Sequence, residues 1–333
     1  MTIDPKIRSE ALGIIRERKA QRLAELSRRR EEIYRTVPRI REIDARLRRD
    51  SAEAALTALR HGSSVSAAIE TLKNDSLDLQ AERCELLVAN GYPASYLDDE
   101  SVCPLCGDTG YVGATPCKCF TELAKKCQVR ELSHVLDMES VSFDSFDFSY
   151  YSDSVDPHWG ASPRENAYLA YDYCLEYARK FDTMEGSLFL NGGTGLGKTF
   201  LSTCIAREVA NAGFSVVYET AVDMLSHFEA AQFNREEDES ETKRAVNRVL
   251  NCDLLIIDDL GTELTTAFTQ SALYTVINTR LLNGRKTVIN SNLTMEDVRR
   301  RYSQQILSRL EGEFNTVFLF GQDIRLQKKQ RKK

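Results

Sequence analysis

The sequence predicts an α/β fold, in which a parallel sheet follows a helical arm and a small cysteine-rich module. Between about residues 163 and 324, short apolar runs alternate with amphipathic stretches, a pattern typical of strand–helix units around a parallel sheet. Residues 5–90 instead repeat apolar side chains at helical spacing. The predicted segments are a helical or coiled-coil arm (1–92), a cysteine module with a helix (98–138), an aromatic tether (139–162), the α/β domain (163–324) and a basic tail (325–333).

Bulk properties narrow the class of protein. The 333 residues are 42% hydrophobic, enough for a buried core and more than one domain. A net charge of −6 argues against a general binder of polyanions. We expect no signal peptide, no membrane partner and a cytoplasmic location, because the first residues lack an apolar segment and no run nears the ~20 apolar residues that span a bilayer.

The arm should contain two helical stretches. Pro38 predicts a kink or a break in the first, residues 61–64 interrupt the pattern, and a second helix is expected from 65 to about 89, giving a helical hairpin or coiled coil. Residues 1–50 hold 13 Arg and 2 Lys against 9 Asp and Glu, a net charge of +6. Nucleic acid is one partner for this charge, but the interleaved Glu residues and the lack of an aromatic stacking platform favour a solvated or protein-docking surface.

The α/β domain should hold five strands. A helix at about 121–136 and an aromatic, turn-rich stretch at 141–160, which should pack onto the next domain, precede them. The expected strands are 187–191, 215–219, 254–258, 287–290 and 316–320. The basic tail after residue 324 is expected to be a disordered, solvated end, although its charge could contact DNA phosphates.

A phosphate-binding loop is predicted between the first strand and its helix. The segment matches G-x-x-x-x-G-K-[ST] in full and consists of Gly192, Gly193, Thr194, Gly195, Leu196, Gly197, Lys198 and Thr199. Glycines let backbone amides close around phosphates, and the helix N-terminus adds a positive field. Lys198 should bridge the β- and γ-phosphates of ATP, and the Thr199 hydroxyl should ligate Mg²⁺. The alternative is an ordinary glycine-rich turn.

Two carboxylates end the apolar run 254–257, at the edge where parallel sheets bind their ligands. Asp258 is placed to hold Mg²⁺, and Asp259 to polarise the attacking water. The alternative is an acidic pair that caps the following turn. A whole strand–helix unit fits between Lys198 and Asp258, an arrangement that resembles the additional-strand class of P-loop ATPases. A P-loop kinase or GTPase is the alternative, and the lack of a guanine-reading N-K-x-D motif argues against a GTPase.

These motifs resemble a known family. LLIIDDLGTE at 254–263, NSNLTMEDV at 290–298 and the segment 300–325 are similar to the DnaC/DnaI-type bacterial helicase loaders and the IstB-type transposition ATPases. CPLCGDTGY at 103–111 resembles the zinc module of the Gram-positive members. The resemblance implies an AAA+ P-loop domain whose five parallel strands lie in the order 5-1-4-3-2.

The resemblance also implies two further site residues. Asn292 would be the sensor-1 residue that reaches the γ-phosphate or the water; alternatively it caps the next helix, for which Thr294 also qualifies. Arg309 would be an arginine finger acting on a neighbouring subunit's ATP in a homo-oligomer; alternatively it is a solvated helix arginine. Arg325, just after the last strand, is a weaker candidate for contact with the nucleotide or an interface.

The chain departs from this family at two points. Asp259 stands where most such ATPases carry Glu, and its shorter side chain predicts slow hydrolysis; Glu263 lies close enough in sequence to assist. Only 13 residues follow Phe320, too few for a helical lid domain. Both departures favour a switch over a motor.

The cysteine cluster predicts a zinc site. Cys103, Cys106, Cys117 and Cys119 have the spacing C-x2-C and C-x-C, which suits tetrahedral Zn²⁺. A module of some 20 residues cannot build an apolar core, so the metal would supply its folding energy. A redox dithiol or unliganded thiols are the alternatives.

The resemblance implies a DNA-replication accessory protein, a helicase loader that uses ATP binding and slow hydrolysis to switch its binding of single-stranded DNA and of a replicative helicase. Two alternatives stay open. One is an IstB-like transposition helper ATPase, and the other is a coiled-coil and zinc adaptor whose ATP site only stabilises the fold.

Overall fold

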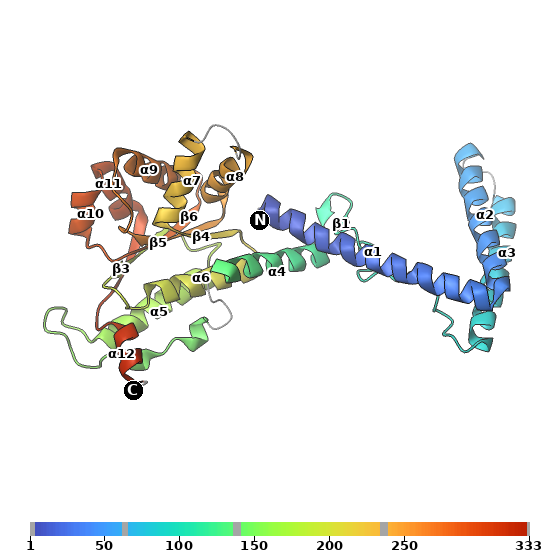
Figure 1. Cartoon of the computed structure of the whole chain (residues 1–333), viewed down its shortest axis with the longest axis horizontal. Helices are drawn as coiled ribbons and strands as arrows, with labels where there is room; N and C mark the ends of the chain where they lie inside the picture. Colours follow the sequence, from blue (N-terminus) through green and yellow to red (C-terminus); the bar gives the residue numbers. More distant parts are fainter. Residues whose placement is uncertain (1–3, 62–65, 136–140, 234–238, 332–333) are drawn as a thin grey trace. The chain divides into compact units, whose positions relative to one another are not determined.

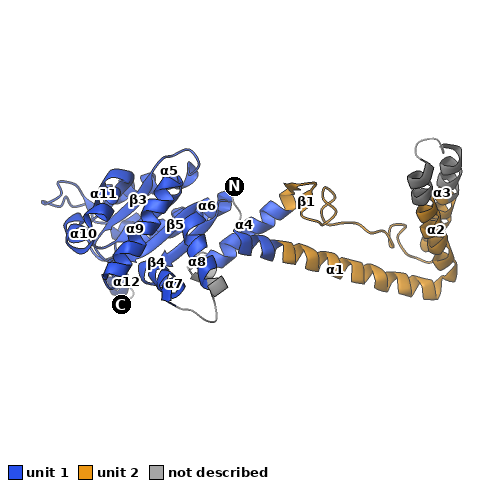
Figure 2. Ribbon diagram, turned by 90° about the horizontal axis from the view of Figure 1, so that it is seen from above, with its two compact units in different colours: residues 1–11, 120–333 blue, residues 12–119 orange. Residues whose placement is uncertain are grey.

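The computed structural model describes residues 4–61, 66–135, 141–233 and 239–331. The chain divides into two compact units, one made of Met1–Ala11 with Phe120–Lys333 and the other of Leu12–Cys119 (Figure 2). The predicted segment boundaries are not those of the two units, and they stay predictions. The predicted interruption at 62–64 lies outside the described residues.

Helices dominate the Leu12–Cys119 unit. Helix α1 (Pro5–Thr36) runs into it from the other unit, and α2 (Pro38–His61) and α3 (Ser66–Ala89) pack side by side. The break predicted at Pro38 is confirmed, because α1 ends at Thr36 and Pro38 opens α2, where its missing N–H costs no helical hydrogen bond. A small apolar core holds the unit together: Ile33, Val37, Ile40, Leu87 and Leu97.

A short hairpin and a helix follow this arm. The two-residue strands β1 (Tyr111–Val112) and β2 (Thr115–Pro116) pair antiparallel. The helix predicted at 121–136 is α4 (Lys118–Val135), which begins earlier, between the last two clustered cysteines; its predicted final residue lies outside the described residues. Two short 3₁₀ turns, η2 (Phe143–Ser145) and η3 (Phe148–Tyr150), lie in the aromatic stretch.

The larger unit is built on a five-stranded parallel sheet (Figure 1). Its strands are β3 (Ser187–Gly192), β4 (Val216–Thr220), β5 (Leu254–Leu260), β6 (Lys286–Ser291) and β7 (Phe314–Leu319). They lie in the order β4-β5-β6-β3-β7, and every neighbouring pair is parallel. Numbered within this sheet, that is the order 5-1-4-3-2, so the predicted topology is confirmed.

Helices cover both faces of the sheet (Figure 1). One face carries α5 (Pro163–Arg179) and α6 (Lys198–Ala212). The other carries α7 (Ala221–Phe233), α8 (Glu239–Asn251), α9 (Ala267–Leu282), α10 (Met295–Arg301) and α11 (Gln304–Glu313). In β5, Leu254 and Ile256 pack toward the first face, and Leu255 and Ile257 toward the second. Burial on both faces explains why the strand is an unbroken apolar run.

The basic tail is not the disordered end that the sequence suggested. Residues 324–331 form helix α12 (Ile324–Arg331). Its first turn is anchored by the Ile324 amide, which donates to the Gly195 carbonyl at 2.9 Å. Near its end, the Arg331 guanidinium donates to the Ser149 carbonyl and lies over the Tyr150 ring. The expectation was wrong because these anchors come from residues far away in sequence.

The first turns of α1 belong to the larger unit. The Arg248 guanidinium on α8 donates to the Asp4 carboxylate at 2.9 Å, and the Lys6 ammonium pairs with Glu131 on α4 at 2.8 Å. Ile7 is buried nearby. In the part of the chain that the structure describes, no helix combines the length and the apolar character needed to cross a bilayer.

Candidate functional site

The glycine-rich loop joins the C-terminal end of β3 to the N-terminus of α6, as predicted. Its glycines are required by close approach and by backbone conformation. Gly192 has φ +144°, and a Cβ there would collide with the Leu319 carbonyl on β7. Gly195 has φ +74°, and a Cβ there would collide with the Asp323 carboxylate. The loop therefore wraps tightly at the mouth of α6, where amides and the helix field favour an anion.

Lys198 is held over this loop. Its ammonium donates to the carbonyls of Gly192 and Gly193 at 2.8 and 2.7 Å, and to Asn292 Oδ1 at 2.6 Å. The side chain is only 6% exposed, and burial lowers the pKa of Lys198 to about 8. Lys198, which is predicted to bind phosphates, and Asn292 are thus brought together, although they lie 94 residues apart.

The oxygen donors predicted to hold Mg²⁺ also meet. The Thr199 hydroxyl lies 3.4 Å from Asp258 Oδ1, at the junction of α6 and β5. A hydroxyl and a carboxylate are hard oxygen ligands of the kind that Mg²⁺ binds together with substrate phosphates. The residues present therefore fit this metal.

A β-bulge brings the second carboxylate to the same place. Consecutive strand residues normally point to opposite faces, but the register of β5 against β6 shifts between Ile257 and Leu260. Asp259, in this bulge, has φ +54°, a conformation that non-glycine residues seldom adopt. Asp258 stays buried beneath the loop, while Asp259 lines the cavity described next. Burial, and then the charge of Asp258, raise the pKa of the Asp259 carboxyl, which makes it a better proton acceptor.

A cavity of about 370 Å³ opens beside the loop. One wall comes from the aromatic stretch before α5: Phe146, Tyr150 and Tyr151. The Tyr151 hydroxyl donates to the Leu196 carbonyl at 2.8 Å, which fastens this wall to the phosphate loop. Aromatic rings next to a phosphate site offer stacking surfaces for a purine base. The sequence marked this stretch only as a tether, because nothing local shows which cavity its rings line.

Helix α12 also contributes to the lining of the cavity. Ile324, Arg325 and Lys328 line the cavity, so Arg325, the weaker candidate, lies beside the predicted phosphate site. Its charge acts on both Lys198 and Asp259. A basic side chain here can contact an anionic ligand.

Three predicted residues are placed as follows. Thr294 caps α10, because its hydroxyl accepts the Asp297 amide at 3.1 Å; Asn292 is not the cap and lines the cavity. Glu263 is buried, its carboxylate accepts the Gly261 amide and the Tyr302 hydroxyl, and it does not line the cavity.

Arg309 lies apart from the cavity, on α11, where its guanidinium donates to Asn278 Oδ1 at 3.0 Å. A contact with ATP would thus have to be made with another subunit. Its role stays a prediction.

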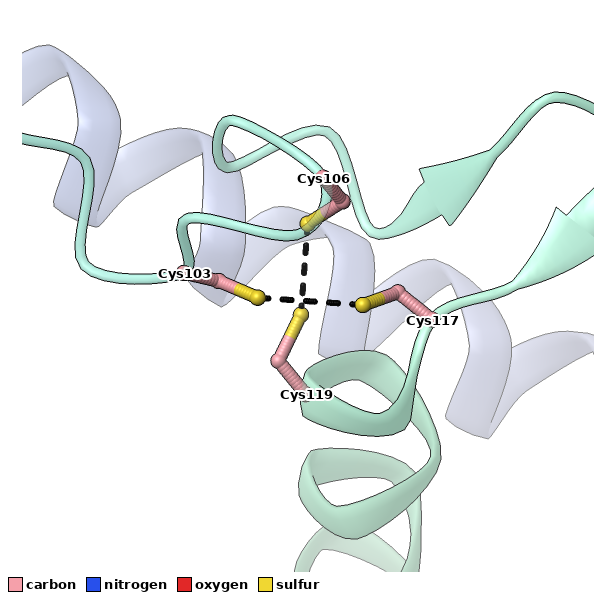
Figure 3. A group of neighbouring side chains, drawn as sticks. All are labelled: Cys103, Cys106, Cys117 and Cys119. Carbon is pink, nitrogen blue, oxygen red and sulfur yellow. Dashed lines mark hydrogen bonds between the residues drawn. The ribbon is translucent and has the colours of Figure 1, made fainter.

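The four clustered cysteines form a second centre (Figure 3). Their sulfur atoms all lie within 4.8 Å of one another, with Cys103 3.7 Å from Cys117 and Cys106 3.5 Å from Cys119. Tetrahedral thiolates around zinc are separated by about 3.8 Å, so the set fits the metal. The buried Asp108 carboxylate accepts the Cys103 amide at 2.8 Å and pairs with Arg22 of α1, which orders the loop.

Several arm arginines are occupied by neighbouring carboxylates. Arg28 and Arg29 pair with Glu25, and Arg39 pairs with Glu82 and Glu42. This pairing reduces the charge available to a polyanion, as the solvated or protein-docking interpretation expects.

The profile of the family described as "IstB-like ATP binding protein" matches residues 163–332. The chain is similar to the replicative helicase loader DnaC of Buchnera aphidicola subsp. Baizongia pistaciae, 27% identical over 135 residues, which cover 40% of this chain and 54% of that protein. It is 25% identical to DnaC of Escherichia coli K12 over 148 residues, covering 44% and 59%.

The chain thus spans about half the length of these curated relatives. A crystal structure described as the DnaC helicase loader is 18% identical, with 56% of this chain and 99% of that chain covered and a TM-score of 0.46.

Proposed function

The chain belongs to the IstB-like ATP-binding protein family, and on this premise we propose that it is an ATP-driven accessory protein of DNA replication that loads a replicative helicase. The observation that carries the proposal is the convergence of Lys198, Asn292, Thr199 and Asp258 at one end of the sheet. Support for the replication role comes from the similarity to proteins named as replicative helicase loaders.

The residues would divide the work as follows. The loop amides and Lys198 bind the β- and γ-phosphates of ATP, and the aromatic wall takes the base. Mg²⁺ held by Thr199 and Asp258 would neutralise charge on the phosphates. Asp259 accepts a proton from the attacking water, and Asn292 orients that water or the γ-phosphate.

Hydrolysis is expected to be slow. The Asp259 carboxylate is one methylene shorter than the Glu of most such ATPases, and Arg309 of another subunit must arrive to complete the site. ATP would therefore act as a switch: the bound form assembles and binds single-stranded DNA and the helicase, and hydrolysis releases them. The arm and the Cys103–Cys119 zinc module are the proposed docking surface for the helicase.

The test measures binding of the full chain to a fluorescent single-stranded oligonucleotide by anisotropy, with ATP, with ADP and without nucleotide. ATP should raise the affinity of the wild type at least about tenfold, the scale of a typical coupling free energy. Lys198→Ala should remove this effect. Lys180→Ala, which changes an exposed lysine of the same unit, should keep it.

Two outcomes would favour the alternatives. If Lys198→Ala binds DNA and the helicase as the wild type does, the ATP site is structural and the chain is an adaptor. If the full chain captures a transposase and no helicase, the alternative of a transposition helper ATPase is favoured.

A further inference from the structure

Asp258 is surrounded by donors that the sequence motifs do not include. The Tyr218 hydroxyl on β4 donates to Asp258 Oδ2 at 2.7 Å. The Asn290 amide on β6 donates to Asp258 Oδ1 at 2.8 Å. The Asp259 backbone amide also donates to Oδ1, at 2.9 Å. Strands on both sides of β5 thus send a side chain to the same carboxylate.

A third side chain connects these two donors. Ser202 on α6 accepts a second hydrogen bond from the Asn290 amide at 2.8 Å, and its hydroxyl lies 3.2 Å from the Tyr218 hydroxyl. Ser202 and Asn290 are completely buried, and Tyr218 is 6% exposed. The network therefore lies beneath the Mg²⁺ ligands, one helical turn below Thr199.

The phenol at position 218 has no packing explanation. Tyr218 belongs to the apolar core between the sheet and α6, where a phenylalanine ring would fill the same volume. A buried hydroxyl is unfavourable unless it is hydrogen-bonded. The Tyr218 hydroxyl is hydrogen-bonded to Asp258 and lies within hydrogen-bond distance of Ser202. Burial, and then the Asp258 charge, raise the pKa of Tyr218 well above its usual value, which keeps the hydroxyl a donor.

A carboxylate that holds a metal works best when its orientation is fixed beforehand. Groups that hydrogen-bond to a metal ligand commonly change metal affinity by about 10–100-fold. The Oδ2 oxygen of Asp258 accepts one hydrogen bond, from Tyr218, and keeps lone-pair capacity for a metal or its bound water, whereas Oδ1 accepts both the Asn290 and the Asp259 amides.

We propose that Tyr218 and Asn290 are positioning residues that orient Asp258 for Mg²⁺. The proposal rests on the proposed function, since it concerns the metal of the same ATP site. The expected effect is specific to the metal. Loss of either donor should weaken the binding of Mg²⁺ and leave metal-free nucleotide binding by the phosphate loop unchanged.

The experiment titrates Mg²⁺ into the full chain with a fluorescent ATP analogue, and separately measures analogue binding in EDTA. Tyr218→Phe should raise the half-saturating Mg²⁺ concentration about tenfold and leave the affinity in EDTA unchanged. Tyr177→Phe is the matched control, because it removes another buried hydroxyl, one that donates to the Gly186 carbonyl away from the site. That control should match the wild type.

Two further measurements separate positioning from general destabilisation. In an Asp258→Ala background, Tyr218→Phe should add no further change, since the group it acts through is gone. Asn290→Ser should shift the Mg²⁺ requirement in the same direction, and it replaces Tyr218→Phe as the test if that variant does not fold.

The inference is overturned if Mg²⁺ titrates the variant and the wild type alike, or if Tyr177→Phe shows the same shift. A wild type that binds no analogue at all would instead overturn the proposed function, so the two failures are distinguishable.

Discussion

Burial lowers the pKa of Lys198, and the nearby Asp259 and Asp258 charges raise it, so ATP binding should depend on pH. In the free protein, burial lowers its pKa to about 8. ATP phosphates favour the ammonium, so binding raises this pKa again. Below pH 8 the lysine is already charged and affinity should be constant; above pH 8 binding must take up a proton, so affinity should fall by up to about tenfold per pH unit.

Calorimetry between pH 7 and 9.5, in buffers of different ionisation enthalpy, measures both the affinity and the proton uptake. Lys198→Arg provides the control, because its guanidinium stays charged across this range. Its affinity should be lower and independent of pH. A flat profile for the wild type would contradict the prediction.

At the scale of single residues, the motif positions could be predicted because each needs a specific residue type at a fixed spacing. Gly192, Lys198 and Asp258 belong to that group. The roles of Tyr151 and Tyr218 could not be predicted, since a tyrosine in an aromatic stretch or in an apolar strand suggests only packing. Their hydroxyls find partners 45 and 40 residues away, and only the folded sheet brings these groups together.

The backbone conformation of Asp259 could not be predicted from the sequence either. A run of four apolar residues followed by two aspartates predicts a strand with side chains on alternate faces. The bulge in β5 and the positive φ of Asp259 break that alternation and direct the carboxylate into the cavity. Strain of this kind is found at functional sites more often than elsewhere.

At the scale of elements, helix α12 gives a test of the nucleotide site. Arg325→Ala removes a cation that lines the cavity, so it should weaken ATP binding about tenfold, the loss expected for one charge-assisted contact. Lys329→Ala lies on the same helix but does not line the cavity, and it should have little effect. Fluorescent-nucleotide titration at fixed ionic strength measures both. Equal losses of ATP affinity in the two variants would contradict the prediction, because the net charge of the helix would then matter and not a contact of Arg325 in the cavity.

The cysteine module gives a second test at this scale. The purified wild type should hold one zinc per chain, and Cys103→Ser should lose most of it, because three thiolates bind the metal much less tightly than four. Cys84→Ser removes a thiol outside the cluster and should keep the metal. Atomic emission and release of zinc to a coloured chelator measure the content. A wild type purified anaerobically, with all four cluster thiols free and no zinc, would contradict the zinc prediction.

Elements with a strong pattern were predicted well, and the ends of elements less so. The five strands follow the expected apolar runs to within two residues at their starts. Strand β7 begins at Phe314, two residues earlier than expected, because it continues directly from α11. Helix α12 does not follow from the sequence, because six basic residues in a nine-residue tail are typical of a solvated end. The partner that holds Arg331, the Ser149 carbonyl, lies far away in the sequence.

At the scale of the whole molecule, the position of Arg309 predicts cooperation between subunits. Lys198→Ala should not bind ATP, and Arg309→Ala should bind ATP without hydrolysing it at the normal rate. Mixing the two inactive variants should restore part of the activity, because an intact Arg309 can then meet an intact ATP site on its neighbour. Steady-state phosphate release from the mixture, against each variant alone, is the measurement. No recovery at any mixing ratio would argue against action between subunits.

The contacts of Asp4 and Lys6 with Arg248 and Glu131 should keep the chain together after a single proteolytic cut. Because residues 1–11 and 120–333 share one unit, the intervening segment is an insertion that is covalently tied to its host at both ends. A protease that cuts the insertion once leaves two fragments, each of which still contributes residues to the larger unit. The nicked chain should therefore migrate as one species on a native gel and separate only when it is denatured.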